Sequence, residues 1–141
     1  MPSTITFPSS LPYTRSLANG ETIWMPWVDV TYEADSGRRH RTSALVDSGA
    51  TWSSIPEEIA INRLHIDLTL CERKRIRGIS GIEEVPCQDM TVSLLGRSIR
   101  CTILFTKGDL YLLGHVPIFS NFLFAFEENQ QPGSYRLLYK P

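Results

Sequence analysis

An aspartate that directly follows a strand of apolar residues constrains this chain more than any other feature. Residues 44–46 read Ala-Leu-Val, which is typical of a buried strand, and Asp47 comes next. A carboxylate away from water is costly unless hydrogen bonds or a partner group compensate for the lost hydration. The sequence therefore predicts that Asp47 either belongs to a functional site or caps a local structure.

The residues after Asp47 are small and mostly polar: Ser48, Gly49, Ala50 and Thr51. Glycine and alanine leave space for another backbone to approach closely, as a peptide substrate would. The hydroxyl of Ser48 is placed to hydrogen-bond to a neighbouring loop. We therefore predict a tight loop that presents Asp47 and is shaped by the four residues after it.

Two strand-like stretches come before this loop and predict a hairpin. They cover Ile23 to Tyr32 and Thr42 to Val46. The polar stretch Ala34 to Arg39 between them contains a glycine and predicts the turn. After the loop, Pro56 and the two acidic residues that follow it predict the start of a short helix.

The second half of the chain follows the same plan. Strands are predicted at Glu83 to Leu94 and at Ser98 to Phe105, with a turn at Gly96. The apolar stretch Leu110 to Leu113 then leads to a glycine, and Pro117 to Phe122 predicts a second short helix. We therefore expect an all-β protein of two pseudo-repeated halves with one or two short helices.

The two ends of the chain have weaker signals. Residues 1–20 are rich in Pro, Ser and Thr and predict an extended N-terminal arm, with a short strand at Thr4 to Phe7. Ser134 to Tyr139 predict a last strand. We expect a single domain over residues 21–141, because one core usually serves about 100 to 200 residues.

Composition argues against several classes of function. The net charge of -1 gives no reason to expect nucleic acid as a partner, and no apolar run is long enough to predict a membrane segment. Cys71, Cys87 and Cys101 form no CxxC pair and predict neither a disulfide framework nor a zinc site. No phosphate-binding or dinucleotide motif is present. We expect a cytoplasmic protein with no metal and no cofactor.

A second Asp-Ser-Gly triplet, Asp35-Ser36-Gly37, provides an internal comparison. It lies in the predicted hairpin turn and lacks a preceding apolar strand. Aspartate and serine side chains bond to nearby backbone in turns, and glycine supplies a positive φ. We therefore interpret this triplet as a turn and assign the site to Asp47.

The segment 44–51 resembles the catalytic motif of the retropepsins, the retroviral-type aspartic peptidases. Five further residues resemble the tip of the flap, the hairpin that closes over bound substrate in that family: Arg77, Gly78, Ile79, Ser80 and Gly81. Three others resemble the apolar element that passes beside the catalytic loop: Leu112, Leu113 and Gly114. The resemblance covers about residues 24–126 and keeps the family's order and spacing.

The resemblance implies a closed, β-barrel-like retropepsin (acid protease) fold with ψ-type loops, active as a homodimer on peptide or protein substrates. Aspartic peptidase chemistry needs two carboxylates that share one proton, so that one acts as base and the other as acid. Leu112 stands in the second half at the position that matches Asp47, so one chain brings one carboxylate. A twofold dimer would supply the other Asp47.

The sequence departs from the family at His115-Val116, where relatives carry Arg followed by Asp or Asn. A charged contact that braces the dimer or the helix is therefore expected to be absent, and dimerisation to be weaker or differently built. His115 is either a structural hydrogen-bonding residue or a pH-sensitive substitute. The strands near both termini either interleave with those of a partner or complete the chain's own sheet.

Other interpretations stay open at this point. The same fold could serve as a catalytically silent dimerisation or peptide-binding module, and an unrelated small β-barrel that binds a small ligand is a third possibility. Trp52 either lines a substrate pocket or covers the core. Gly78 and Gly81 are also compatible with an ordinary tight hairpin turn.

Overall fold

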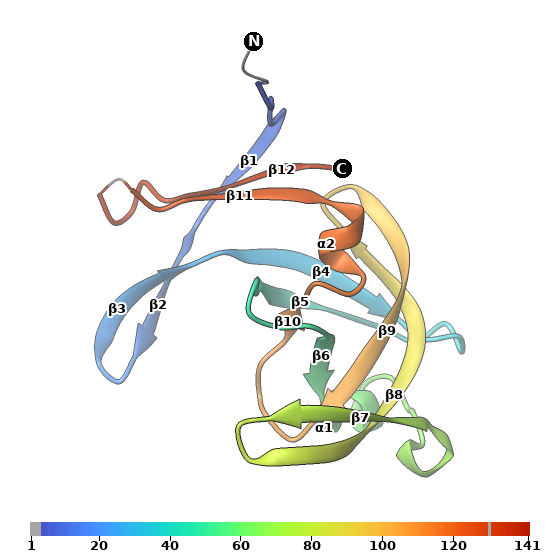
Figure 1. Ribbon diagram of the computed structural model, residues 1–141. Coiled ribbons are helices and arrows are strands. Elements are labelled where there is room, and N and C mark those ends of the chain that lie inside the picture. Colours follow the sequence, from blue (N-terminus) through green and yellow to red (C-terminus); the bar gives the residue numbers. More distant parts are fainter. Residues whose placement is uncertain (1–3, 130) are drawn as a thin grey trace.

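Strands make up most of residues 4–129 and 131–141, which are the residues that the computed structural model describes (Figure 1). The strands are β1 (Ser9–Pro12), β2 (Thr14–Ala18), β3 (Glu21–Met25), β4 (Trp27–Glu33), β5 (Arg39–Val46), β6 (Ser53–Pro56), β7 (Glu72–Gly78), β8 (Gly81–Leu94), β9 (Arg97–Thr106), β10 (Leu112–Leu113), β11 (Leu123–Glu127) and β12 (Arg136–Lys140). The helices are α1 (Glu57–Asn62), α2 (Ile118–Asn121) and a 3-10 turn, η1 (Leu68–Leu70). The prediction of an all-β protein with short helices is confirmed.

The main sheet has the strand order β4-β5-β10-β6-β9-β8-β7. The C-terminal part of β8 also pairs with β4, so the sheet curls back on itself (Figure 1). Apolar side chains alternate with polar ones here, as on a strand with one buried face: Val28, Val30 and Tyr32 are buried on β4. The hydrophobic core therefore lies inside the curl.

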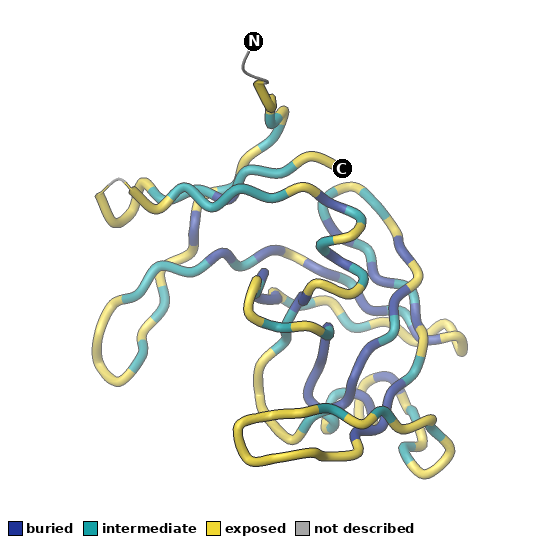
Figure 2. The backbone as a smooth tube through the Cα atoms, viewed as in Figure 1, coloured by how far each residue is buried: buried dark blue, intermediate teal, exposed yellow. Residues whose placement is uncertain are grey.

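The core contains large side chains from both halves of the chain, including Tyr32, Ile55, Phe105, Leu113 and Ile118, all at 1% exposure or less. Complete burial of an apolar side chain is worth roughly 1.5–3 kcal/mol. Figure 2 shows that the buried backbone is concentrated in the curled sheet, whereas the tips of the hairpins are exposed. Burial of these side chains therefore fixes the positions of the strand ends from which the loops start.

A short strand from the second half of the chain is inserted beside the first half. In β10, Leu112 pairs in parallel with Leu45 and antiparallel with Ser54, and Leu113 pairs with Val46. Gly114 follows, and a Cβ atom on it would lie 2.7 Å from the carbonyl oxygen of Ala50. Only glycine permits two backbones to approach this closely.

The predicted hairpin turn and first helix are confirmed, but the strand predicted from Ile23 to Tyr32 is divided at Pro26 into β3, which pairs with β2, and β4, which pairs with β5. The turn between β4 and β5 is closed by hydrogen bonds from Ala34 N to Arg38 O and from Gly37 N to Ala34 O, both 2.9 Å. Helix α1 begins after Pro56 with two acidic residues in its first turn. None of the helices within the described residues has the length and apolar composition needed to cross a bilayer.

The prediction for the N-terminal arm is wrong in one respect. Thr4 to Phe7 form no strand, and Ile5 is 61% exposed. The arm instead carries β1, which pairs with β12 through the register Leu11 to Leu137, and β2, which pairs with β3. Pairing with a strand more than 100 residues away leaves no local signal in Ser-Ser-Leu-Pro, which explains the error.

The terminal strands form a three-stranded sheet in the order β1-β12-β11. Both edges of β12 are thus occupied by strands of the same chain. Leu137 is buried in the chain's own core, and Tyr135 makes an edge-to-face contact with Tyr13. Within the single chain, the terminal strands thus complete the chain's own sheet.

We expect replacement of Gly114 by alanine to destabilise the protein by about 1–3 kcal/mol, because the new methyl group would push against the backbone of Ala50 and Trp52. Gly108→Ala is the matched control, since a Cβ atom there meets nothing within 4 Å. Urea unfolding of both variants measures the difference. Equal stability of the two variants would contradict the close backbone contact of Gly114 with Ala50 and Trp52.

Candidate active site

Asp47 lies at the end of β5, where a tight loop turns around its carboxylate. Its backbone N–H donates to the carbonyl of Leu113 (3.0 Å), and its own carbonyl accepts a hydrogen bond from Ala50 N (3.2 Å). The side-chain Oδ1 accepts a hydrogen bond from Gly49 N (2.9 Å). The carboxylate is half-buried, so this backbone donor compensates for part of its lost hydration.

Gly49 and Ser48 have distinct places in this loop. A Cβ atom at Gly49 would lie 3.2 Å from Asp47 Oδ1, which is tighter than ordinary contact, so glycine suits the close approach of its N–H. Ser48 is exposed, and its side chain is available to a neighbouring molecule. The predicted loop residues thus surround Asp47 as expected from the sequence.

The segment after β10 is tied to the loop residue by residue. His115 N donates to Ala50 O (2.9 Å), and Val116 N donates to Thr51 O (2.8 Å). Gly114 N donates to the hydroxyl oxygen of Ser53 (3.0 Å). The structure therefore brings together the two elements that the sequence predicted to meet, Asp47 to Thr51 and Leu112 to Gly114.

Ser53 is a site residue that the sequence reasoning missed. It is completely buried, and its hydroxyl also donates to Val116 O (3.2 Å). The Ser53 side chain thus holds the segment from Gly114 to Val116 beside the strand that follows the Asp47 loop. Ser53 begins the strand Ser-Ser-Ile-Pro, which gives no local signal for this role, because its partners lie about 60 residues away along the chain.

His115 reaches back to the loop with its side chain. Its Nε2 lies 2.6 Å from Ser48 O, and its ring stacks on Phe119 at 4.6 Å between ring centres with 27° between the planes. Phe119 N in turn donates to His115 O (3.1 Å). Of the two interpretations of His115, the structure shows the structural hydrogen-bonding residue.

The hairpin of β7 and β8 extends from the main sheet near α1 (Figure 1). Its tip contains the five residues predicted as a flap tip, Arg77 to Gly81, and all of them are exposed. Gly78 pairs with Gly81 across the turn, and Gly81 has a φ of 122°. Ile79, a large apolar side chain, is completely exposed at the turn.

The stem of this hairpin packs on a small second core. Val85, Cys87 and Leu104 are buried there, with Trp52 and Ile76 packed against them. The ammonium group of Lys74 lies 4.5 Å from the centre of the Trp52 ring, within the range of a cation–π interaction. Trp52, which directly follows the Asp47 loop, therefore covers this small core. It connects the loop to the stem of the hairpin.

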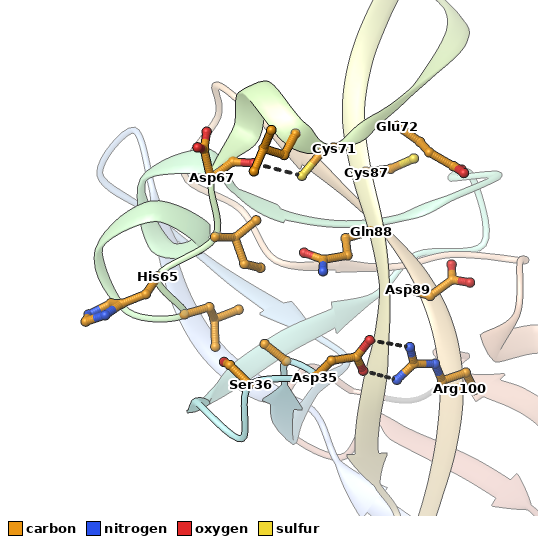
Figure 3. Close-up of a pocket in the computed structure, with 14 residues that line it drawn as sticks. Asp35, Ser36, His65, Asp67, Cys71, Glu72, Cys87, Gln88, Asp89 and Arg100 are labelled. Carbon is orange, nitrogen blue, oxygen red and sulfur yellow. Dashed lines mark hydrogen bonds and ion pairs between the residues drawn. The ribbon is translucent and has the colours of Figure 1, made fainter.

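The other Asp-Ser-Gly triplet lies beside a pocket of about 430 Å³. Figure 3 shows Asp35 and Arg100 facing each other there, with two hydrogen bonds of 2.6 and 3.0 Å. These bonds with Arg100 hold the pKa of Asp35 below its ordinary value. The triplet lies in the predicted turn, but the Asp35 carboxylate bonds the distant Arg100, whereas the sequence predicted a bond to nearby backbone.

The cysteines are free thiols. Cys101 is buried on β9, and desolvation raises the pKa of its thiol to about 12, which keeps it protonated and unreactive. Within residues 4–129 and 131–141, no three His, Cys, Asp or Glu side chains come together in a way that could hold a metal ion.

Neither protein-family models nor curated proteins give a match to the sequence. The likeness to retropepsins thus depends on the chain's own motifs and on their geometry.

The Asp35–Arg100 pair predicts a pH-dependent contribution to stability. The pKa of Asp35 is lowered in the folded state, so the pair stabilises the fold above the ordinary aspartate pKa of about 3.9 and ceases to do so as the pH falls through the lower folded value. We expect Asp35→Asn to lower the Tm slightly at pH 7 and hardly at all near pH 2.

Asp29→Asn is the matched control, because Asp29 lies farther from its partner Arg41 (3.7 Å) and both side chains are 78% exposed. Calorimetric melting of the wild type and both variants at the two pH values measures the effect. A Tm difference for Asp35→Asn that grows on acidification would contradict the assigned direction.

Proposed function

We propose that this chain is one half of an aspartic endopeptidase of the retropepsin type, which becomes active as a homodimer. The observation that carries the proposal is the Asp47 loop. A half-buried carboxylate there has one oxygen held by Gly49 N–H, and the crossing at Gly114 fastens the loop to the second half of the chain. Asp67 has the same kind of bond, from Thr69 N to its Oδ1 (3.0 Å), so the feature that distinguishes Asp47 is the contact of its loop with the segment around Gly114.

The chemistry requires a second carboxylate. Two Asp47 side chains in contact share one proton, because like charges at close range cannot both ionise. The ionised carboxylate takes a proton from a water molecule, and the resulting hydroxide attacks the peptide carbonyl carbon. The protonated carboxylate donates its proton to the carbonyl oxygen. The carboxylate that took the proton from water then gives it to the leaving nitrogen, and the other carboxylate takes a proton from one hydroxyl of the tetrahedral intermediate. The carbonyl double bond re-forms, the C–N bond breaks, and the pair again shares one proton.

The second carboxylate comes from another copy in this proposal. In the parallel register of β10 with β5, Leu112 lies beside Leu45 and Leu113 beside Val46, so the residue that comes next to Asp47 is Gly114. The inserted strand therefore contributes backbone and apolar side chains to the site. A twofold axis close to Asp47 would place the matching group of a twin chain opposite.

Two other features support the same fold. The pairing of β8 with β4, which curls the main sheet, supports a barrel-like fold of the retropepsin type. The exposed tip Arg77 to Gly81, carried on a stem that is packed against Trp52, suits a flap that moves at its tip and is anchored at its base. The glycines at positions 78 and 81 permit such movement.

The dimer would differ from the interleaved arrangement of the family. Because both edges of β12 are taken by β1 and β11, the contact between copies would be made mainly around the Asp47 loop. The second candidate function, a catalytically silent dimerisation or peptide-binding module, keeps the same fold. The two functions differ in whether the dimer cleaves peptides.

We expect Asp47→Asn to reduce cleavage of fluorescein-labelled casein at about pH 5 by a factor of roughly 10²–10⁴, because the amide cannot act as the general base. Asp35→Asn is the control with an equivalent triplet outside the site, and it should keep nearly full activity. Sedimentation of all three proteins shows whether dimers are present. Cleavage that survives Asp47→Asn would refute the proposal, and wild-type dimers without cleavage would favour the silent module.

A further inference from the structure

We propose that His115 is a positioning residue for Asp47 and acts through the single peptide group that joins Ser48 to Gly49. The imidazole Nε2 lies 2.6 Å from the carbonyl oxygen of Ser48. The N–H of the same peptide group, that of Gly49, donates to Asp47 Oδ1 at 2.9 Å. One planar peptide unit is therefore bonded to the histidine on one side and to the carboxylate on the other.

The direction of these hydrogen bonds is fixed by chemistry. A carbonyl oxygen can only accept, so Nε2 of His115 must carry the proton and donate it. The peptide N–H of Gly49 can only donate, and Asp47 Oδ1 accepts. The chain of donors thus runs in one direction, from the imidazole through the peptide group to the carboxylate.

Each hydrogen bond in this series strengthens the next one. A donor on the carbonyl oxygen withdraws electron density from the peptide group and makes its N–H a better donor, so consecutive hydrogen bonds polarise one another. The bond from Gly49 to Asp47 Oδ1 should accordingly be shorter and more firmly oriented with His115 in place. Oδ1 is then held, while Oδ2 is left to face water or the carboxylate of a second copy.

His115 is itself held in the orientation that this role needs. Its ring stacks on Phe119, which is packed against the main core, and its backbone N–H donates to Ala50 O at 2.9 Å. The ring and the backbone of one residue therefore contact the same loop at two points, Ser48 and Ala50. The backbone contact would remain with other residues at this position, so the imidazole contact with Ser48 O is the one that depends on the histidine.

The inference concerns this chain's own departure from the family pattern, since a histidine replaces the usual arginine. Its consequence for catalysis rests on the proposed function, whereas the hydrogen-bond chain itself does not. The two can therefore be tested separately with one pair of variants. His115→Gln and His115→Met have side chains of the same length, and only glutamine keeps an N–H donor near the position of Nε2.

The first measurement is the amide proton resonance of Gly49 in ¹H–¹⁵N NMR spectra of wild type and both variants. We expect it to move upfield in His115→Met, because the peptide group is no longer polarised, and to stay near the wild-type position in His115→Gln. The amide of Ala50, which donates to the carbonyl of Asp47, is the internal reference and should differ little. Coincident Gly49 resonances in the two variants would overturn the inference.

The second measurement is the kinetics of a quenched fluorescent peptide, chosen from the sites at which the wild type cuts casein. We expect kcat to fall about tenfold in His115→Met with little change in KM, and to recover to within about twofold in His115→Gln. An equal loss of kcat in both variants would overturn the inference while Asp47→Asn still abolishes cleavage. If Asp47→Asn leaves cleavage intact, the proposed function fails, and the Gly49 resonance alone decides the hydrogen-bond chain.

Discussion

The close contact between two backbone segments at Gly114 is the constraint on which the rest of the structure depends. β10 is inserted between β5 and β6, and the absence of a side chain at Gly114 allows the backbone to pass against Ala50 and Trp52. The hydrogen bonds that this contact permits fix the loop that carries Asp47. Fold and site are thus joined at one glycine, more than 60 residues from the carboxylate in sequence.

The site combines a carboxylate that is hard to bury with a scaffold that makes its burial tolerable. Asp47 is half-buried because the buried strand before it ends there, and Gly49 N–H compensates for part of the lost hydration. The loop is held by the segment after β10, through bonds from His115 to Ala50 O and Ser48 O and from Val116 N to Thr51 O. In the proposed dimer, the remaining oxygen of Asp47 would face the matching carboxylate of the second copy.

Features with local signals were predictable from the sequence. The hairpin of β4 and β5, the start of α1 after Pro56 and the Asp35 turn follow from residues within a few positions of each other. The meeting of the Asp47 loop with Leu112 to Gly114 was predictable only through the resemblance to retropepsins. Strand β1 and the contacts of Ser53 and His115 were not, because each depends on partners about 60 to 130 residues away, and such pairings are decided by the whole fold.

The central claim is that each chain provides one carboxylate and that two are needed. Wild-type and Asp47→Asn chains, unfolded together in equal amounts and refolded, would pair at random if they form twofold dimers. The account predicts about one quarter of the casein-cleaving activity of the same total amount of wild type, because only dimers with two Asp47 side chains share the proton. An activity of about one half would show that each chain works alone and would contradict the account.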